Sequence, residues 1–503
     1  MKNFSKIAII CICLLFIAIF TSACGSSKAN PPQTFPYWLL TQNNNQQENN
    51  NQQEENNEEE PVITTEINLT LTDSKDADKI ATADIYYSSN TTKKSSADDK
   101  EILKASPNAD EKTKFTVTVN GTAENTKIKA ILTYDNEGNL IDYFSSYNGV
   151  EATNGTYDID FGNSKDNEEG FGGGNGEDEP YIISAPRHFV NINKQDDQGN
   201  YLYLDKSFTQ TEDIDFSHLT GLKIVSATDD KDITVEKTNE KAPFYNDGYG
   251  ITPIGKIGDL NTAEGHQNCF NGNYDGNNKT IDGIMFVNPD TQYISLFPGF
   301  TGYSLKNINI GSNSIIYLDK ILNKQSLFIG TITTWRNEKN IEEEENDKIL
   351  IENCVNNCKI VLKNSNIGSV TISGISCYDQ CKPKYTNCIN NANISVTNNE
   401  IGSINIAGCF INTMESYVSV NNCINNGIIK VANNKMLELE GYSVNSVINV
   451  SGLFLTNVYY SSGSDPIIIP VDPNNPPIPI IIPVDPNNPP FSFPADPIHI
   501  LFP

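Results

Sequence analysis

Positive charge is scarce in this sequence. Its 503 residues contain 35 Lys and Arg against 63 Asp and Glu, a formal net charge of −28, and the arginines are limited to Arg187 and Arg336. Proteins that bind nucleic acids or acidic sugars use many basic side chains, among them the bidentate guanidinium group. The composition therefore excludes nucleic acid as a partner and argues against polyanionic ligands.

Histidine is also scarce, and no motif of a catalytic site is apparent. The four histidines, His188, His218, His266 and His499, are scattered and form no metal-binding spacing. Paired carboxylates of the kind that glycoside hydrolysis requires are not evident in the repeated part of the chain, and no nucleophile motif is present. We therefore predict no catalytic residues. The alternative is a carbohydrate-active enzyme, a polysaccharide lyase or a glycoside hydrolase.

The longest apolar run is short and lies at the N-terminus. It extends from Ile7 to Phe20, follows Lys2 and Lys6, and is too short to span a bilayer comfortably. The next residues, Thr21 to Cys24, resemble the lipobox of bacterial lipoproteins, with Thr21 in place of the usual Leu. The resemblance implies a signal peptide over residues 1–24, a lipidated Cys24 and a membrane anchor. The alternative is an ordinary secretory signal that is cleaved nearby.

Composition divides the chain after this signal. Residues 25–61 are rich in Asn, Gln and Glu and predict a disordered tether. Residues 62–162 contain short alternating segments, such as 67–71 and 115–119, that predict a small antiparallel β-sandwich-like module. Residues 163–179 are Gly-rich and acidic, which predicts a flexible linker.

Residues 180–463 are predicted to form one repeat domain, and a five-residue phrase that occurs three times in it is the main evidence. Its copies begin at Asn353-Cys354, Asn387-Cys388 and Asn422-Cys423, and each is followed by apolar residues at every second position. A period of this length predicts a solenoid, in which equivalent residues of successive coils stack about 4.8 Å apart. We therefore expect an all-β fold, a right-handed parallel β-helix or solenoid, with structural ladders of these Asn and Cys side chains.

A second sequence pattern begins before the three repeated phrases and ends at the third. Its parts are Tyr181–Ser184, Asp213–Phe216, Ile251–Gly255 and Phe270–Ile281, followed by Leu327–Gly330 and Asn422–Gly427. This order resembles bacterial surface proteins that carry the GLUG motif, with Ser295 standing where that motif has Gly. The resemblance covers roughly residues 180–460 and implies a repeat fold that occurs in adhesins, in secreted peptidases and in proteins without an assigned role.

Two kinds of side chain are candidates for metal binding. Asp213, Asp215 and Asp275 offer the oxygen ligands that calcium prefers, although Asp in such turns more often caps backbone groups. Eight cysteines follow Cys24, and Cys354-x3-Cys358 and Cys377-x3-Cys381 could form half of a zinc site. Disulfides are a further alternative, while burial as small apolar side chains is the favoured interpretation. No other cofactor is predicted.

The C-terminal residues 464–503 contain an 11-residue segment twice, at Ile467–Pro477 and Ile480–Pro490. Its prolines predict an extended rod that acts as a spacer or contacts a cell wall or partner. The order of anchor, tether, module, solenoid and rod favours a lipid-anchored protein on the outer surface of a bacterial envelope. We expect an adhesive or interaction role toward glycans or proteins of a host or neighbouring cell, with a structural envelope protein as a further alternative.

Overall fold

The computed structural model describes residues 64–89, 101–225, 233–258, 267–336, 350–379, 384–412, 419–432, 434–436, 448–449 and 458–461. The predicted signal peptide with Cys24, the tether and the Pro-rich tail lie outside these residues. The chain divides into two units, Met1–Pro61 and Val62–Pro503, and the described residues all belong to the second. None of the helices in the described residues is long and apolar enough to cross a membrane.

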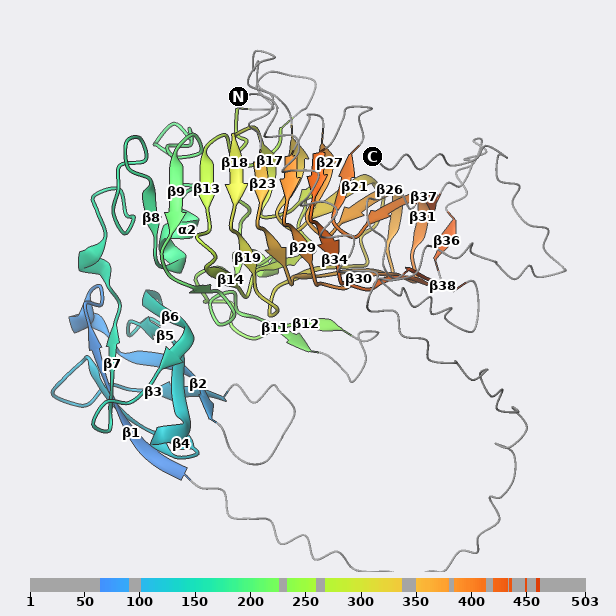
Figure 1. The fold of residues 1–503 in the computed structure, drawn as a ribbon. Helices are drawn as coiled ribbons and strands as arrows, with labels where there is room; N and C mark the ends of the chain where they lie inside the picture. The colour runs from blue at the N-terminus through green and yellow to red at the C-terminus, as the bar shows by residue number, and fades with distance from the viewer. Residues whose placement is uncertain are drawn as a thin grey trace, which may run out of the picture. The chain divides into compact units, whose positions relative to one another are not determined.

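The all-β prediction is confirmed. Apart from the short helix α2 (Pro186–Asn191) and a few 3-10 turns, the regular elements of the described residues are strands (Figure 1). Most of them belong to parallel sheets, an arrangement that is consistent with a β-helix or solenoid.

The first seven strands form a module of two sheets, with the orders β4-β1-β7 and β3-β2-β5-β6. These strands are β1 (Thr64–Thr72), β2 (Thr82–Ser89), β3 (Glu101–Ala105), β4 (Lys114–Asn120), β5 (Thr126–Tyr134), β6 (Leu140–Val150) and β7 (Thr156–Asp160). Alternate residues of β4, such as Phe115 and Val119, are buried against Leu69 of β1. One detail of the antiparallel prediction is wrong, since β1 and β7 run parallel. The chain reaches β7 by crossing from the other sheet, and such a connection allows parallel pairing.

Residues 163–179, predicted as a flexible linker, are packed and hydrogen-bonded. The Phe171 side chain is fully buried and stacks on Tyr181, with ring centroids 4.4 Å apart. The Asn191 amide donates to the carbonyl groups of Glu169 and Gly170, at 2.9 Å each. Phe171 and these hydrogen bonds attach the Gly-rich segment to the core, which its composition alone did not indicate.

The remaining strands form five parallel sheets, which we call the stack, and one antiparallel hairpin, β11-β12. The sheet orders are β33-β28-β23-β18-β13-β9-β8, β10-β14-β19-β24-β29-β34, β15-β20-β25-β30-β35-β38, β16-β21-β26-β31-β36 with β37 also on β31, and β17-β22-β27-β32. Their bounds are β8 (Tyr181–Ile183), β9 (Ser207–Gln210), β10 (Ile214–Asp215), β11 (Leu222–Val225), β12 (Thr234–Lys237), β13 (Asn273–Asp275), β14 (Thr280–Asp282), β15 (Met285–Val287), β16 (Tyr293–Ile294), β17 (Phe297–Phe300), β18 (Ser304–Lys306), β19 (Asn309–Ile310), β20 (Ile315–Asp319), β21 (Lys324–Gly330), β22 (Thr333–Arg336), β23 (Leu350–Glu352), β24 (Val355–Asn356), β25 (Lys359–Lys363), β26 (Asn366–Ser373), β27 (Ser376–Asp379), β28 (Lys384–Thr386), β29 (Ile389–Asn390), β30 (Ile394–Thr397), β31 (Glu400–Ala407), β32 (Phe410–Asn412), β33 (Ser419–Asn421), β34 (Ile424–Asn425), β35 (Ile429–Ala432), β36 (Lys435–Met436), β37 (Ile448–Asn449) and β38 (Val458–Ser461).

From β13 to β32 the chain passes through the five sheets in a fixed order, so each circuit adds one strand to each sheet; we call one circuit a rung. Tyr274, Leu305, Ile351 and Tyr385 follow one another in register on successive rungs, and all four side chains are fully buried. Columns of this kind form the core of the stack. The chain between Leu305 and Ile351 includes residues 337–349, an acidic segment that lies outside the described residues.

The module and the stack share a third hydrophobic core. Outward side chains of the β3-β2-β5-β6 sheet contact the segment around β11-β12 and the outer side of β20 and β25. The participants include Tyr86, Ala130, Leu132, Tyr134, Leu219, Leu222, Tyr245, Met285, Ile315, Tyr317 and Val361. Because apolar area is removed from water on both sides, this contact stabilises the module and the stack as one unit.

Candidate functional site

The repeated phrase places its first asparagine at the turn before a short strand. Asn353, Asn387 and Asn422 have φ angles of 53°, 52° and 52°, the left-handed region that Asn tolerates better than most residues. The Asn387 amide donates to Oδ1 of Asn353 at 3.0 Å, and the Asn422 amide donates to Oδ1 of Asn387 at 3.3 Å. The structure thus aligns these side chains in a column along the stack.

The fourth residue of the phrase forms a second column, inside the stack. The amide of Asn356 donates to Oδ1 of Asn390, and that of Asn390 donates to Oδ1 of Asn425, both at 2.8 Å. Asn390 also bonds the backbone of Ala392 through both ends of its amide, at 3.1 and 3.3 Å. Every polar group of this buried side chain therefore has a partner, which burial requires. The repetition of this Asn was visible in the sequence, but it was not recognised as a structural residue.

The fifth residue of the phrase forms a third column, on the outside. The Asn391 amide donates to Asn357 at 3.0 Å and the Asn426 amide donates to Asn391 at 2.9 Å. An aliphatic column, in which Ile424 is 48% exposed, runs between the first and third columns. We call this surface the Asn/Ile face, and it consists of Asn353, Val355, Asn357, Asn387, Ile389, Asn391, Asn422, Ile424 and Asn426.

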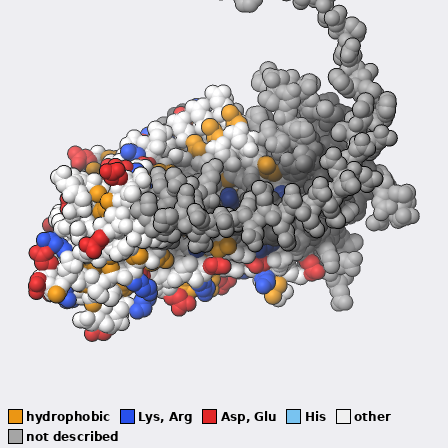
Figure 2. Space-filling model, turned by 90° about the horizontal axis from the view of Figure 1, so that it is seen from below, with side chains coloured by type: hydrophobic (Ala, Val, Ile, Leu, Met, Phe, Trp, Pro, Cys, Tyr) orange, Lys and Arg blue, Asp and Glu red, His pale blue; other side chains and the backbone are white. Residues whose placement is uncertain are grey.

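The Asn/Ile face carries no charged side chain, although the chain as a whole is strongly acidic. It belongs to the sheet whose strands β14, β19, β29 and β34 follow one another along one side of the stack (Figure 1). Seen from below, charged side chains are spread over the left and lower parts of the described surface, while an area at its upper edge is mostly white and orange (Figure 2). An uncharged surface with regular amide and aliphatic columns can bind an uncharged partner through hydrogen bonds and apolar contacts.

The first rungs of the same sheet are occupied by the module. Ser145 of β6 donates to the carbonyl oxygen of Asp215 at 2.6 Å. The Tyr147 hydroxyl lies near Asp282, Asp213 and Asp215; burial raises the pKa of Tyr147, and these carboxylates raise it further. The Asn/Ile face lies on the later rungs of this sheet, those of β24, β29 and β34.

The predicted calcium ligands all accept hydrogen bonds from backbone amides of the chain. Asp213 accepts from the Thr280 backbone at 2.7 Å, and Asp215 accepts from the Ser217 backbone at 2.8 Å. Asp275 accepts from the Asn277 backbone at 2.9 Å and from the Asn307 amide at 2.8 Å, which continues the first Asn column. No three His, Cys, Asp or Glu side chains in the described ranges are grouped in a way that could hold a metal ion.

The cysteines of the phrase form a buried column. Cys354, Cys388 and Cys423 are at most 4% exposed and are free thiols, and the Cys388 backbone amide donates to the sulfur of Cys423 at 3.4 Å. The hydrogen bond from Cys354 raises the pKa of Cys388, and burial raises that of the nearby Cys409 to about 12. These thiols act as small core side chains. Cys381 lies outside the described residues.

A polar network joins the segment 163–179 to α2. Arg187 holds the Asp166 carboxylate with two bonds, at 2.6 and 2.7 Å, and His188 Nε2 donates to the same carboxylate at 2.7 Å. Nδ1 of His188 faces both the backbone amide and the hydroxyl of Ser184, at 3.1 and 3.2 Å. Burial pushes the pKa of Asp166 upward, but the bonds from Arg187 and His188 hold it below its usual value.

Ser, His and Asp are the residue types of the catalytic triad of many hydrolases. Here the geometry of Ser184, His188 and Asp166 favours a structural role. His188 is 1% exposed, its Nδ1 lone pair already accepts from the Ser184 backbone, and Arg187 neutralises Asp166. A cavity of about 340 Å³ lies beside the network and is lined by Ser184, Asp166 and Arg187 among others. The sequence did not reveal the network, because Asp166 lies 21 positions before Arg187 without a common motif.

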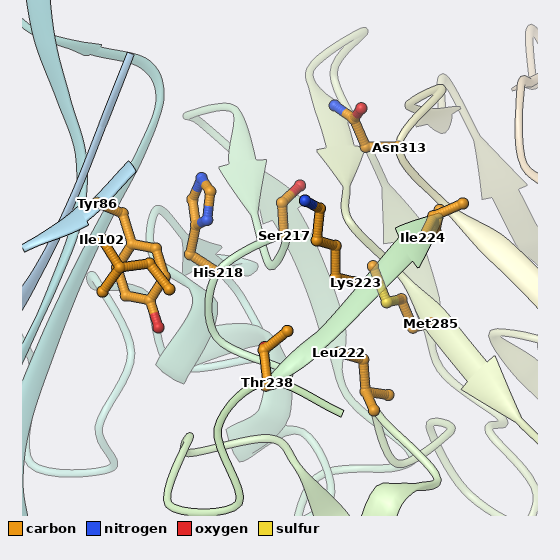
Figure 3. Close-up of a pocket in the computed structure, with 11 residues that line it drawn as sticks. Tyr86, Ile102, Ser217, His218, Leu222, Lys223, Ile224, Thr238, Met285 and Asn313 are labelled. Atoms are coloured by element: carbon orange, nitrogen blue, oxygen red, sulfur yellow. The ribbon is translucent and has the colours of Figure 1, made fainter. Parts of the chain in front are cut away.

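A second, smaller cavity of about 100 Å³ lies where the module meets the stack (Figure 3). Tyr86 lies beside the His218 ring at a centroid distance of 4.7 Å, and Ser217 and Met285 complete part of the lining. The buried Ser217 hydroxyl has no hydrogen-bond partner among the described residues. Space of this size fits a few water molecules, which would satisfy such a hydroxyl.

No family model matches this chain, and no curated protein matches it. Among solved structures, the chain is similar to a protein of Bacteroides ovatus described as a "putative immunoglobulin A1 protease". The identity is 16%, the match covers 55% of this chain and 84% of the other, and the TM-score is 0.30. At this distance the fold and the function of the chain must be argued from its own residues.

Proposed function

We propose that the stack is a right-handed parallel β-solenoid, and that the protein is a lipid-anchored bacterial surface protein with an adhesive or interaction role. Parallel sheets that each gain one strand per circuit from β13 to β32 support the solenoid. The apolar segment before Cys24 and the polar residues 25–61 support an anchor and a spacer.

The Asn/Ile face is the observation that carries the adhesive role. In the aliphatic column Val355 and Ile389 are half-buried and Ile424 is 48% exposed. Exposed apolar groups rimmed by polar groups are a feature of binding surfaces. Here the aliphatic column lies between two columns of amides that are held in place by hydrogen bonds from rung to rung. Such preorganised groups lose little conformational entropy when a partner binds.

The enzyme alternative receives less support from the same residues. Asp213, Asp215 and Asp275, the carboxylates singled out from the sequence, accept hydrogen bonds from backbone amides: Asp215 and Asp275 from residues two positions later, and Asp213 from Thr280 on another rung. A carboxylate engaged in this way is less available as a general acid or nucleophile.

Adhesion of cells that express the full chain tests the proposal. We expect such cells to attach to partner cells, matrix proteins or glycan-coated surfaces more than cells without it, and Ile424→Lys to abolish most of the difference. Thr386→Lys is the matched control, because Thr386 points outward from the neighbouring sheet, one rung before Ile424. Equal attachment by cells with and without the protein would contradict the proposal.

A further inference from the structure

The columns of the Asn/Ile face have the same order when they are read from either side. On the rung of β29 the outward residues are Asn387, Ile389 and Asn391, and the rungs of β24 and β34 repeat the pattern with Val355 and Ile424 at the centre. A two-fold axis that lies in the plane of the contact, either along the columns or along the strands, brings the aliphatic column onto its own copy and each Asn column onto an Asn column. This is the symmetry that an isologous contact requires.

The asparagine side chains of the two outer columns can also form hydrogen bonds with the same columns of a second copy. Asn387 and Asn391 each donate one bond to the preceding rung and accept one from the following rung. A carboxamide carries two N–H groups and an oxygen with two lone pairs. One donor and one acceptor per amide therefore remain for a partner, and a second array of amides offers both in equal number.

The distribution of charge also favours the Asn/Ile face as the surface of contact. Two copies of a chain with a net charge of −28 repel each other over most of their surfaces. The nine residues of the Asn/Ile face are uncharged, so a contact between two such faces places none of their side chains against a like charge of the same face.

We propose that the Asn/Ile face binds the same face of a second copy of this chain, which makes the adhesion homophilic; this inference rests on the proposed function. Three rungs spaced about 4.8 Å apart and about 14 Å wide cover roughly 200 Å² per copy, below the roughly 800 Å² of a stable interface. A single pair is therefore weak. Many copies anchored on two facing surfaces hold them together by multivalency.

Clustering of beads that carry the full chain tests this inference. Beads with the wild-type chain should cluster, and Ile424→Lys should reduce the clustering rate at least about tenfold, while Thr386→Lys leaves it unchanged. The central rung supplies a sharper test, because a two-fold axis at β29 places Ile389 against Ile389 of the second copy. Ile389→Lys beads and Ile389→Glu beads should each fail to cluster alone and should cluster when mixed. Unchanged thermal unfolding of each variant shows that the fold is intact.

The outcomes separate the two proposals. If wild-type beads stay dispersed while expressing cells still adhere to glycans or to other proteins, the partner is not a second copy and the adhesive function stands. If neither beads nor cells adhere, both proposals fail. Clustering that Ile424→Lys does not reduce, or mixed Ile389→Lys and Ile389→Glu beads that stay apart, would also overturn the two-fold contact.

Discussion

The side-chain amide of Asn356 donates a hydrogen bond to Oδ1 of Asn390, 2.8 Å away, and both side chains are 0% exposed. A polar side chain is expensive to bury unless its groups are all paired, and this pair achieves it by stacking the same amide on consecutive rungs. A shift of register by one residue would separate Asn356 from Asn390 and place it beside Ile389 or Asn391 instead. The column therefore specifies how the rungs align.

Removal of one buried amide should destabilise the stack. We expect Asn390→Ala to lower the free energy of unfolding by about 2–4 kcal/mol, because it leaves a cavity and removes bonds to Asn356 and Asn425. Asn391→Ala is the matched control on the same rung, and its exposed amide should change the value by about 0.5 kcal/mol or less. Urea denaturation measures both, and equal effects would contradict the role of the buried column.

Gly408 lies against the same column. A Cβ atom at Gly408 would lie 2.4 Å from Cγ of Asn425, which is too close for van der Waals contact. We expect Gly408→Ala to cost about 1–3 kcal/mol, measured by thermal unfolding. Gly199→Ala is the comparison, because its Cβ meets nothing within 4 Å and its φ of 84° adds backbone strain of about 1 kcal/mol. An unaffected Gly408→Ala variant would show that this close contact does not exist.

The buried thiols should resist alkylation in the folded protein. At pH 8, iodoacetamide should leave Cys388 and Cys409 unmodified, because both are buried and their pKa values are raised. After denaturation both should react, and peptide mass spectrometry distinguishes the two states. Modification of Cys388 or Cys409 in the native protein, or disulfide-linked peptides that contain either residue, would contradict the burial of these two thiols.

The network around His188 predicts a dependence of stability on pH. Burial lowers the pKa of His188 below 6.5, whereas Asp166 opposes this shift. The unfolded chain then binds a proton more readily than the folded chain, so this contribution is complete above about pH 6.5 and declines as the pH falls through the lowered pKa. The melting temperature of the wild type should fall more between pH 7 and pH 5 than that of His188→Gln. An equal decline in both would exclude His188 as the source.

The regular part of the fold could be predicted from the sequence because its contacts repeat. Asn353, Asn387 and Asn422 occur at nearly equal spacing, and a solenoid turns equal spacing into direct contact. The alternation after each phrase likewise indicated which side chains enter the core, such as Ile360 and Ile394. All-β architecture with parallel sheets follows from these two patterns.

Other features could not be predicted, because they depend on single contacts between unrelated segments. The Arg187–Asp166 pair, the buried Phe171 and the core shared by Tyr134 and Tyr245 have no periodic signal. The sequence predicted only part of the Asn/Ile face, because a ladder was predicted for the first asparagine of the phrase but not for the fourth and fifth. Their separation into an inner and an outer column requires knowledge of where each short strand turns.

Display of the stack outside the cell is the central claim, and protease shaving of intact cells tests it most directly. Cells that express the full chain are treated with protease without lysis, and the released peptides are identified by mass spectrometry. We predict peptides from residues 181–460 among those released from unlysed cells, with a cytoplasmic protein as the control for leakage. Protection of these residues until the cells are lysed would contradict surface display and with it the adhesive role.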